Sequence, residues 1–280
     1  MPTPSSALSQ YLALIAAAEG PSDRLEIALA IARASVHRIV RGRGALHVRR
    51  AVTLRHEGIR YRVPPFDNSF VSASPGEANG PVVRELLAQL TSRPQPWILD
   101  IGANIGFVSL LLAQRHRDRR VLSVEPIPWL ADALRESAHA NGFDHVTVAN
   151  FALADAAEIT LEVPRLDGVW FTTLSSGASH ASAEARTVEC QQVRVPAMTL
   201  DALCQQESIG PEQIACVKID VEGAEAWVLE TGRAALAAGP PIVFEALTPE
   251  HLAEIRGVLD SLGYAGLRSL DRTNFLATVS

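Results

Sequence analysis

The sequence predicts an α/β protein built on a mostly parallel sheet, and three observations lead to this prediction. Residues 97–115 form a short apolar run that ends in an acid, then a glycine turn, then a run of helix formers. Residues 121–125 are a second apolar run ending in an acid. Residues 216–225 repeat the pattern of strand, glycine turn and helix, and we expect this helix to span residues 225–237. Strands that alternate with helices in this way are typical of βαβ units, whose strands lie parallel.

Length and composition suit one large α/β domain with an appendage. The chain has 280 residues, of which 48% are hydrophobic, and this is enough to bury a full core. The formal net charge is −6 and the isoelectric point is near 5.8. An acidic chain of this kind disfavours nucleic acid as a partner, so we expect none.

Cysteine use and the first residues indicate a cytoplasmic protein. The three cysteines, Cys190, Cys204 and Cys216, are too few and too scattered for a disulfide framework or a zinc cluster, and we expect no bound metal. Residues 1–9 lack the positive region of a signal peptide, and no apolar run is long enough to span a bilayer. We therefore expect no membrane partner.

Residues 1–78 are predicted to form a helical and hairpin cap in front of the main domain, which we place at residues 79–280. Residues 5–41 carry apolar side chains at helical spacing, and residues 46–63 alternate between apolar and polar side chains about a central turn. Residues 64–80 are rich in Pro, Ser, Gly and Asn and predict an entry loop. We expect the cap to shape a pocket or to form the interface of a homodimer.

Arginines are concentrated in this cap. They either attract an anionic substrate or an acidic carrier domain, or form a solvated face that balances acids elsewhere, and we favour the second interpretation. The arginines concerned are Arg33, Arg38, Arg41, Arg43, Arg49, Arg50, Arg55, Arg60 and Arg62.

The turn after the first strand of the main domain, residues 101–106, reads I-G-A-N-I-G and predicts a ligand-binding loop. Its two glycines let the backbone pass close to a ligand, and the following helix directs free N–H groups toward the turn. A dinucleotide fingerprint needs a glycine where this chain has Asn104, so the loop favours a nucleoside without a pyrophosphate over a nicotinamide cofactor. The alternative is that the glycines only pack a helix closely against a strand.

Two further strand ends complete the predicted nucleoside site. Glu125, followed by Pro126, ends the second strand, where a carboxylate accepts hydrogen bonds from both ribose hydroxyls. The third strand, residues 146–148, leads to Ala152, whose backbone we place beside the base. The glycine loop and the distant acid together resemble motif I and the ribose-binding acid of class I S-adenosylmethionine-dependent methyltransferases.

Three charged residues, Lys218, Asp220 and Glu222, follow one another at the end of a buried strand that we place beside the first. Charged groups in such a place are costly unless they are paired or used. Lys218 is the only lysine of the chain, which suggests that its shape matters. We therefore favour a functional role, with a local salt-bridge cluster as the alternative. Glu245 adds another acid at the end of a later strand.

Residues 156–200 depart from the alternation of strands and helices. Two predicted paired strands, residues 159–163 and 192–195, flank a long loop at residues 172–185 that contains His180. Long loops in compact domains are typically lids, binding loops or disordered segments, and we expect this one to close over the pocket as a lid. A single loop histidine is more often solvated than catalytic.

A more specific resemblance begins at residues 218–225, K-I-D-V-E-G-A-E. Together with I-L-D-I-G-A-N-I-G-F, V-E-P and V-F-E-A, this block resembles the FkbM family of methyltransferases over residues 79–280. The resemblance implies a Rossmann-like class I methyltransferase fold with a seven-stranded sheet, and S-adenosylmethionine as methyl donor. Known members mostly methylate oxygen on polyketides, sugars or other small metabolites. By position, the donor-binding residues are Asp100, Gly102, Asn104, Gly106 and Glu125.

We therefore expect an enzyme that methylates an oxygen of a small-molecule acceptor, such as a secondary metabolite or a sugar. The methyl of the donor is already activated, so the enzyme has to align the acceptor and remove its proton. The resemblance places Asp220 and Glu222 at the transferable methyl. Asp220 is the leading base and also belongs to the predicted donor site, and Glu222 and Glu245 are second choices. Methylation of carbon or nitrogen and a catalytically silent donor-binding or assembly subunit are the alternatives.

Overall fold

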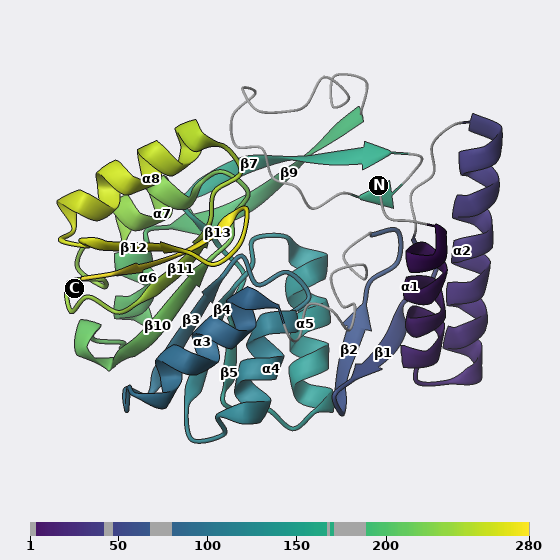
Figure 1. Cartoon of the computed structure of the whole chain (residues 1–280), viewed down its shortest axis with the longest axis horizontal. Helices are drawn as coiled ribbons and strands as arrows, with labels where there is room; N and C mark the ends of the chain where they lie inside the picture. The colour runs from purple at the N-terminus through teal and green to yellow at the C-terminus, as the bar shows by residue number, and fades with distance from the viewer. Residues whose placement is uncertain (1–3, 42–46, 68–79, 167–168, 171–188, 280) are drawn as a thin grey trace.

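A seven-stranded sheet forms the centre of the computed structural model, which describes residues 4–41, 47–67, 80–166, 169–170 and 189–279 (Figure 1). Strands β5, β4, β3, β10 and β11 run parallel to one another. Strand β13 lies between β11 and β12 and runs antiparallel to both. This sheet confirms the predicted α/β class with seven mostly parallel strands. In order across the sheet, the strands are β12 (Gly266–Ser269), β13 (Asn274–Thr278), β11 (Ile242–Glu245), β10 (Ile214–Ile219), β3 (Trp97–Ile101), β4 (Arg120–Val124) and β5 (Val146–Ala149).

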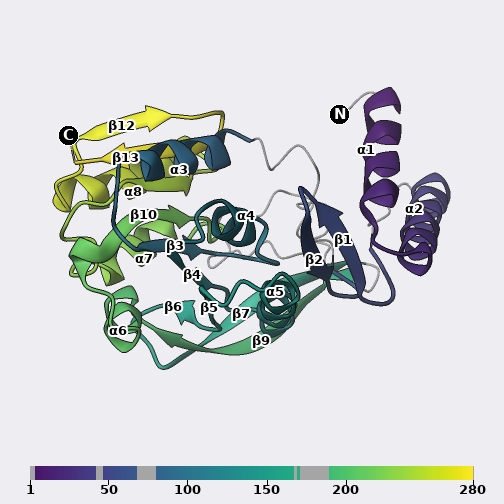
Figure 2. The same ribbon diagram turned by 90° about the horizontal axis from the view of Figure 1, so that it is seen from below.

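Helices cover both faces of this sheet (Figures 1 and 2). Every residue of β3 and β10 is buried, as expected for parallel strands packed on two sides. Along β3, Ile98 belongs to the core under one set of helices and Leu99 to the core under the other. The first set is α3 (Pro81–Thr91), α4 (Phe107–Arg115) and α5 (Pro128–Ala140), and the second is α6 (Leu200–Gln206), α7 (Glu225–Thr231) and α8 (Pro249–Ser261).

The strand order reverses between β3 and β10. From β3 the chain continues to β4 and β5 on one side, and it returns to β10 on the other side of β3. Lys218 of β10 lies in register with Asp100 of β3, so the charged ends of the two strands are adjacent. Open α/β sheets bind ligands in the crevice at this reversal, outside the carboxyl ends of the strands.

A smaller four-stranded sheet is formed by the part of the chain between β5 and β10. The predicted paired strands are confirmed as β7 and β9, which run antiparallel and are longer than predicted. The predicted lid at residues 172–185, with His180, lies outside the described residues. The strands of this sheet are β6 (Ala152–Leu153), β9 (Glu189–Met198), β7 (Glu158–Leu166) and β8 (Val169–Trp170).

The N-terminal region contains two helices and a hairpin, as predicted, and the hairpin packs against α5 (Figure 1). The backbone N–H of Arg60 donates to Asn141 Oδ1 at 2.9 Å, and that of Arg62 donates to Ser137 Oγ at 2.7 Å. The ring of Tyr61 stacks on Phe107 with 5.3 Å between centroids. The predicted boundary at residue 78 lies outside the described residues. The elements are α1 (Pro4–Ala17), α2 (Pro21–Arg41), β1 (Val52–His56) and β2 (Ile59–Val63).

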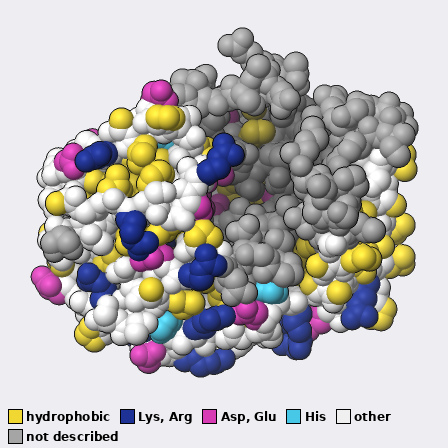
Figure 3. Space-filling view, in the orientation of Figure 1, with side chains coloured by type: hydrophobic (Ala, Val, Ile, Leu, Met, Phe, Trp, Pro, Cys, Tyr) yellow, Lys and Arg dark blue, Asp and Glu magenta, His cyan; other side chains and the backbone are white. Residues whose placement is uncertain are grey.

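Acidic side chains accompany the arginines of the cap. Figure 3 shows the two kinds of side chain interspersed along the lower margin of the molecule. This pairing favours the interpretation of the arginines as a charge-balanced surface. The ion pairs are Arg33 with Glu26, Arg50 with Asp23, Arg55 and Arg60 with Glu19, and Arg62 with Glu136.

The helix after the second glycine turn is shorter than the sequence predicts. We expected a helix over residues 225–237, but α7 ends at Thr231. The next residue, Gly232, packs against α6, where an added β-carbon would lie 2.6 Å from Leu200 Cδ2. Close packing between α6 and α7 thus coincides with the end of the helix.

Among the described residues, no helix combines the length and apolar character needed to cross a membrane.

Candidate active site

The loop predicted to bind the donor, residues 101–106 and called the donor loop below, connects β3 to α4 and touches the turn that follows β10. Gly102 and Gly106 have φ angles of 76° and 85°, a region that L-amino acids with side chains rarely adopt. A β-carbon on Gly102 would overlap the carbonyl oxygen of Asp220, and the N–H of Asp220 donates to the carbonyl of Ile101 at 3.0 Å. The two stretches that the sequence singled out therefore meet through their backbones.

Lys218 links the donor loop to this turn through its ammonium group. Its Nζ lies 3.1 Å from Asp100 Oδ1 and 3.4 Å from Asp220 Oδ2, and it donates to the carbonyl of Gly102 at 2.9 Å. Burial alone lowers the pKa of Lys218, but the two carboxylates outweigh that effect and the net shift is upward. Lys218 is thus a buried cation that donates one hydrogen bond, to the carbonyl of Gly102, and forms ion pairs with two carboxylates. The ion-pair cluster that we considered as an alternative is present, and it lies within the candidate site.

Asp100 is held on its other side by serines. Its side chain has no exposed surface, and Ser109 Oγ of α4 donates to Asp100 Oδ2 at 2.5 Å. Ser123 Oγ of β4 in turn donates to Ser109 Oγ at 2.7 Å. A buried carboxylate needs such partners because it has lost its hydration. Asp100 therefore supports the donor loop from the protein interior, through Ser109 of α4 and Lys218 of β10.

Glu125 directly follows β4, and both of its carboxylate oxygens accept hydrogen bonds from the backbone. Oε2 accepts from the N–H of Asn104 at 2.8 Å, and Oε1 accepts from the N–H of Ile127 at 2.9 Å. Burial raises the pKa of Glu125 to about 7, although these hydrogen bonds and Lys218 oppose the rise. A carboxylate has about four acceptor positions, so two remain, which is the number that two ribose hydroxyls need.

The end of β5 is tied to the same region by Asn150. Its Nδ2 donates to the carbonyls of Glu125 at 2.8 Å and of Pro126 at 2.9 Å. Ala152, two residues later, is buried and begins β6, where it pairs with Ala197 of the second sheet. The residues that we predicted for the donor thus lie along the carboxyl ends of three neighbouring strands, with Ala152 at the junction of the two sheets.

The three predicted catalytic acids, Asp220, Glu222 and Glu245, lie together. Carboxylate oxygens from all three lie within 4.8 Å of one another, and each side chain is half-buried. Burial raises the pKa of Glu222 to about 7, and the neighbouring charges of Asp220, Glu245 and Glu225 add to this shift. Burial, followed by the charge of Asp220, likewise raises the pKa of Glu245 to about 7. We call these three residues the acid cluster.

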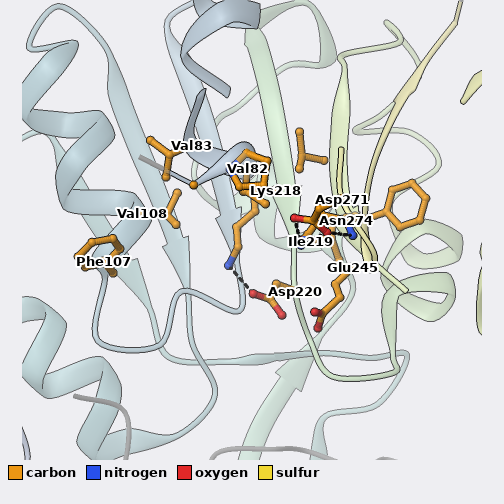
Figure 4. A pocket seen from close by; sticks show the side chains of 14 residues that line it. Val82, Val83, Phe107, Val108, Lys218, Ile219, Asp220, Glu245, Asp271 and Asn274 are labelled. Atoms are coloured by element: carbon orange, nitrogen blue, oxygen red, sulfur yellow. Dashed lines mark hydrogen bonds and ion pairs between the residues drawn. The ribbon is translucent and has the colours of Figure 1, made fainter. Parts of the chain in front are cut away.

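A cavity of about 200 Å³ opens beside the acid cluster (Figure 4). It is enclosed by the first residues of α3 and α4, the ends of β10 and β11, and the segment that leads into β13. Val82, Val83, Phe107 and Val108 form an apolar wall on one side. The polar residues that line it are Lys218, Asp220, Glu245, Asp271 and Asn274.

Residues near the site that the sequence did not single out are Asp67 and Glu225. Asp67 is fully buried and accepts from Trp129 Nε1 at 2.9 Å, and its charge raises the pKa of Glu125. No local pattern marks it, since its partner is 62 residues away. Glu225 is 1% exposed and accepts from the N–H groups of Val221 and Gly223, both at 3.0 Å. An acid at the start of a helix after a glycine turn is the signal for it.

The site suits a nucleoside donor that carries a positive charge. Among the described residues of the Lys218 ion pairs and the acid cluster, carboxylates outnumber cations. The only cation there is the ammonium of Lys218, and the carboxylates are Asp100, Asp220, Glu222 and Glu245. The donor loop supplies a backbone that approaches a ligand closely, and Glu125 retains acceptor positions for a ribose. This combination fits S-adenosylmethionine, whose methyl is bonded to a positively charged sulfur.

Comparison with known proteins connects the site to a family. The model of the methyltransferase FkbM domain matches residues 100–265, and no curated protein matches the chain. Among solved structures, precorrin-6y C5,15-methyltransferase from Geobacter metallireducens is 14% identical, with 70% of this chain and 85% of that chain covered and a TM-score of 0.42. A SAM-dependent O-methyltransferase from Thermotoga maritima is 11% identical, with 81% and 76% covered and a TM-score of 0.43.

TYW2 from P. horikoshii, solved in complex with MeSAdo, is 13% identical, with 88% of this chain and 80% of that chain covered and a TM-score of 0.43. Similarity at this level carries no information about the acceptor. The family match, in contrast, covers more than half of the 280 residues and includes both the donor loop and the acid cluster. The chain therefore belongs to the FkbM methyltransferase family, with the Rossmann-like class I fold and S-adenosylmethionine as its methyl donor.

Proposed function

We propose that this methyltransferase acts on a hydroxyl oxygen of a small molecule bound in the cavity beside the acid cluster. The observation that carries the proposal is the position of the cavity, which opens directly onto Asp220 and Glu245 at the carboxyl ends of β10 and β11. Its volume of about 200 Å³ suits the reacting part of a small molecule better than a folded macromolecule. The apolar wall opposite the acids suits the hydrocarbon part of such an acceptor.

On this proposal the donor is held by the residues of the donor loop and by Glu125. Gly102, Asn104 and Gly106 contact its methionine part, and Glu125 binds its ribose hydroxyls. Asp100, which we predicted for the donor, has no exposed surface and instead supports the loop through Lys218 and Ser109. When bound, S-adenosylmethionine supplies a methyl group activated by the positive sulfur. The remaining tasks, which fall to the protein, are to align the acceptor oxygen and to remove its proton.

The acid cluster supplies the proton acceptor. Asp220 is the leading base because it lines the cavity and its backbone contacts the donor loop, while Lys218 fixes its carboxylate by an ion pair. A base works best when its pKa lies near the working pH. Glu222 and Glu245, whose pKa values are raised to about 7, meet that condition and can relay or accept the proton in turn.

The experiment is to incubate the protein with S-adenosylmethionine that carries an isotopically labelled methyl and with a panel of hydroxyl-bearing small molecules. Release of S-adenosylhomocysteine identifies turnover, and nuclear magnetic resonance of the labelled methyl identifies the atom to which it is bonded. We expect a methyl on oxygen. A methyl on nitrogen or carbon would overturn the assignment to oxygen, and donor binding without any turnover would support the silent subunit instead.

We further propose that the protein works in the cytoplasm. Cys204 and Cys216 are buried, and burial raises the pKa of each thiol to about 12. Thiols of this kind are unreactive packing groups, as expected for cysteines in a reducing compartment. Quantitative thiol labelling of the unfolded protein, without prior reduction, would test this, because disulfide-bonded cysteines would escape the label.

We also propose the cap as the interface of a homodimer. Leu25, Leu29 and Val36 of α2 are 61%, 46% and 56% exposed, and their spacing places them on one side of the helix. Large apolar side chains grouped on a surface are typical of interaction sites. Sedimentation of the protein and of a Leu29→Glu variant would test this, since the substitution should shift a dimer to a monomer.

A further inference from the structure

The turn after β10 carries two residues of the acid cluster, and one of them, Glu222, has a strained backbone conformation. Glu222 has a φ angle of 56°, in the left-handed region that residues with side chains rarely occupy, and Gly223 follows with 108°. Such a conformation persists only when the surrounding structure imposes it. Since Asp220 and Glu222 both belong to this turn, whatever imposes the conformation also positions these two carboxylates.

Glu225 spans the turn with its carboxylate. Its Oε1 accepts from the N–H of Val221 and its Oε2 from the N–H of Gly223, both at 3.0 Å. The two bonds fix the backbone on either side of Glu222. The side chain of Glu225 is 1% exposed, so both bonds lie in the interior of the protein.

His251 of α8 completes the arrangement from a different part of the chain. Its Nε2 lies 2.9 Å from Glu225 Oε2, and its side chain is 6% exposed. The helix begins at this point because Thr248 caps it, with its hydroxyl accepting from the N–H of His251 at 3.2 Å. His251 is therefore fixed by its own helix and offers a ring nitrogen to the carboxylate that spans the turn.

Glu225 needs such a partner because its position is unfavourable for a charge. Burial raises the pKa of Glu225 to about 7, although the hydrogen bonds from Val221 and Gly223 oppose the rise. A buried carboxylate is stabilised when it is both hydrogen-bonded and paired. Glu225 has both kinds of partner, the backbone of the turn on one side and His251 on the other.

We propose that Glu225 and His251 form a positioning pair that fixes the turn carrying Asp220 and Glu222 against the donor loop. Neither residue lines the cavity, so neither is assigned a direct part in methyl transfer. Their effect passes through the backbone N–H groups of Val221 and Gly223. The proposal concerns the geometry of the turn and holds for any acceptor, so it stands or falls separately from methylation at oxygen.

The test is amide hydrogen exchange, resolved by residue, in a His251→Leu variant bound to S-adenosylhomocysteine. The substitution removes the ring nitrogen that lies 2.9 Å from Glu225 Oε2. Loss of this ion-pair partner should speed exchange at Val221 and Gly223 about tenfold. Exchange in the buried strand β10 should stay as in the unmodified protein. A His139→Leu variant is the matched control, because His139 lies exposed on α5.

A conservative variant separates positioning from packing. His251→Gln retains a side-chain N–H donor and should bring exchange at both amides back to within about threefold of the unmodified protein. The proposal is overturned if both amides are unaffected in His251→Leu, if exchange accelerates equally throughout the protein, or if the folded His251→Gln variant gives no recovery.

A second variant covers the case in which His251→Leu does not fold. Glu225→Gln keeps the volume of the side chain and one carbonyl acceptor, so only one of the two amides can remain bonded. We expect faster exchange at either Val221 or Gly223, by about tenfold, and not at both. Unchanged exchange at both amides in this variant would also overturn the proposal.

Discussion

The carboxyl edge of the sheet has two parts whose acids are held in different ways. On the donor side, Asp100 has no exposed surface and Glu125 has 4%, and hydrogen-bond donors on serine or backbone fix each carboxylate. On the cavity side, the Asp220 side chain is 42% exposed, and Glu245 accepts only from Thr273 Oγ1, at 3.1 Å, among its described contacts. The donor side is thus preorganised by its own hydrogen bonds, while the cavity side has spare acceptor positions.

On the proposed assignment of the site residues, this difference separates donor binding from the chemical step. A site that binds the same donor in every turnover gains from acids that are already fixed. A site that takes a proton needs a carboxylate that can change its protonation state, and raised pKa values near 7 in Glu222 and Glu245 provide that. We therefore expect substitutions on the two sides to affect different measurements.

The largest effect should come from the cavity side. Asp220→Asn keeps the side-chain volume and removes the base, so turnover should fall by about 10²–10⁴-fold while donor affinity stays near that of the unmodified protein. Turnover and calorimetry with S-adenosylhomocysteine measure the two quantities. Asp260→Asn, an exposed change on α8, is the control. A loss of donor affinity instead would show that Asp220 binds the donor and is not the base.

The next effect concerns the rigidity of the donor side. Gly102→Ala introduces a β-carbon that overlaps the Asp220 carbonyl and a side chain at a φ of 76°, so the free energy of unfolding should fall by roughly 2–5 kcal/mol. Gly142→Ala is a matched control, because Gly142 has a φ of 65° but no atom within 4 Å of the added carbon. It should cost only about 1–2 kcal/mol. Equal losses in urea unfolding would show that the contact between the two turns is loose.

Glu125 tests whether the fixed acid binds the ribose. Glu125→Ala removes a charged acceptor worth about 1.5–3 kcal/mol per hydrogen bond, so affinity for S-adenosylhomocysteine should fall about tenfold to a hundredfold. Glu254→Ala, an exposed change on α8, should leave the affinity unchanged. Calorimetry that finds equal affinities for Glu125→Ala and the unmodified protein would remove Glu125 from the donor site.

The smallest effect is a pH dependence that distinguishes the two sides. The pKa values of Glu222 and Glu245 are about 7, against an ordinary value of 4.5, so the folded protein binds protons that the unfolded chain has released. These two groups therefore lower the stability of the fold as the pH rises from 4.5 to 7. A positive ligand favours their charged forms, so affinity for S-adenosylmethionine relative to S-adenosylhomocysteine should rise about three- to tenfold between pH 5.5 and pH 8.

Glu125 gives the contrasting result in the same titration. Its pKa is also raised to about 7, but its proposed ligand is the ribose, which both compounds share. A change in its protonation should therefore alter both affinities by the same factor and leave their ratio unchanged. A ratio that stays constant across this pH range would show that the acid cluster does not interact with the positive sulfur.

Much of the fold and of the donor side follows from local sequence. Buried parallel strands are short apolar runs, so β3 and β10 stand out, and the glycine turns after them mark the carboxyl edge. Acids at strand ends are conspicuous for the same reason, and this is how Glu125, Asp220 and Glu245 were predicted. The spacing of these features within each segment was sufficient to predict a shared site. Alternating strands and helices bring the carboxyl ends of the parallel strands to one edge of the sheet.

The partners of these acids could not be predicted in the same way. Asp67 accepts a hydrogen bond from Trp129, 62 residues away. Glu225 at the start of α7 forms an ion pair with His251 of α8. Neither contact leaves a periodic trace in the sequence, because a buried polar pair needs only complementary groups at one point in space. The early end of α7 also coincides with a contact between distant residues, because Gly232 packs against Leu200 of α6, and no local pattern reveals that packing.

The burial of Lys218 also determines how the protein can be modified. It is the only lysine of the chain, its side chain is 9% exposed, and oxygen atoms surround its ammonium. Acylating reagents need an accessible, unprotonated amine, so the lysine of the closed protein should resist them. Labelling of Lys218 would then require the donor loop and the turn after β10 to separate. The rate of that labelling would report how often the closed site opens, and bound donor should slow it.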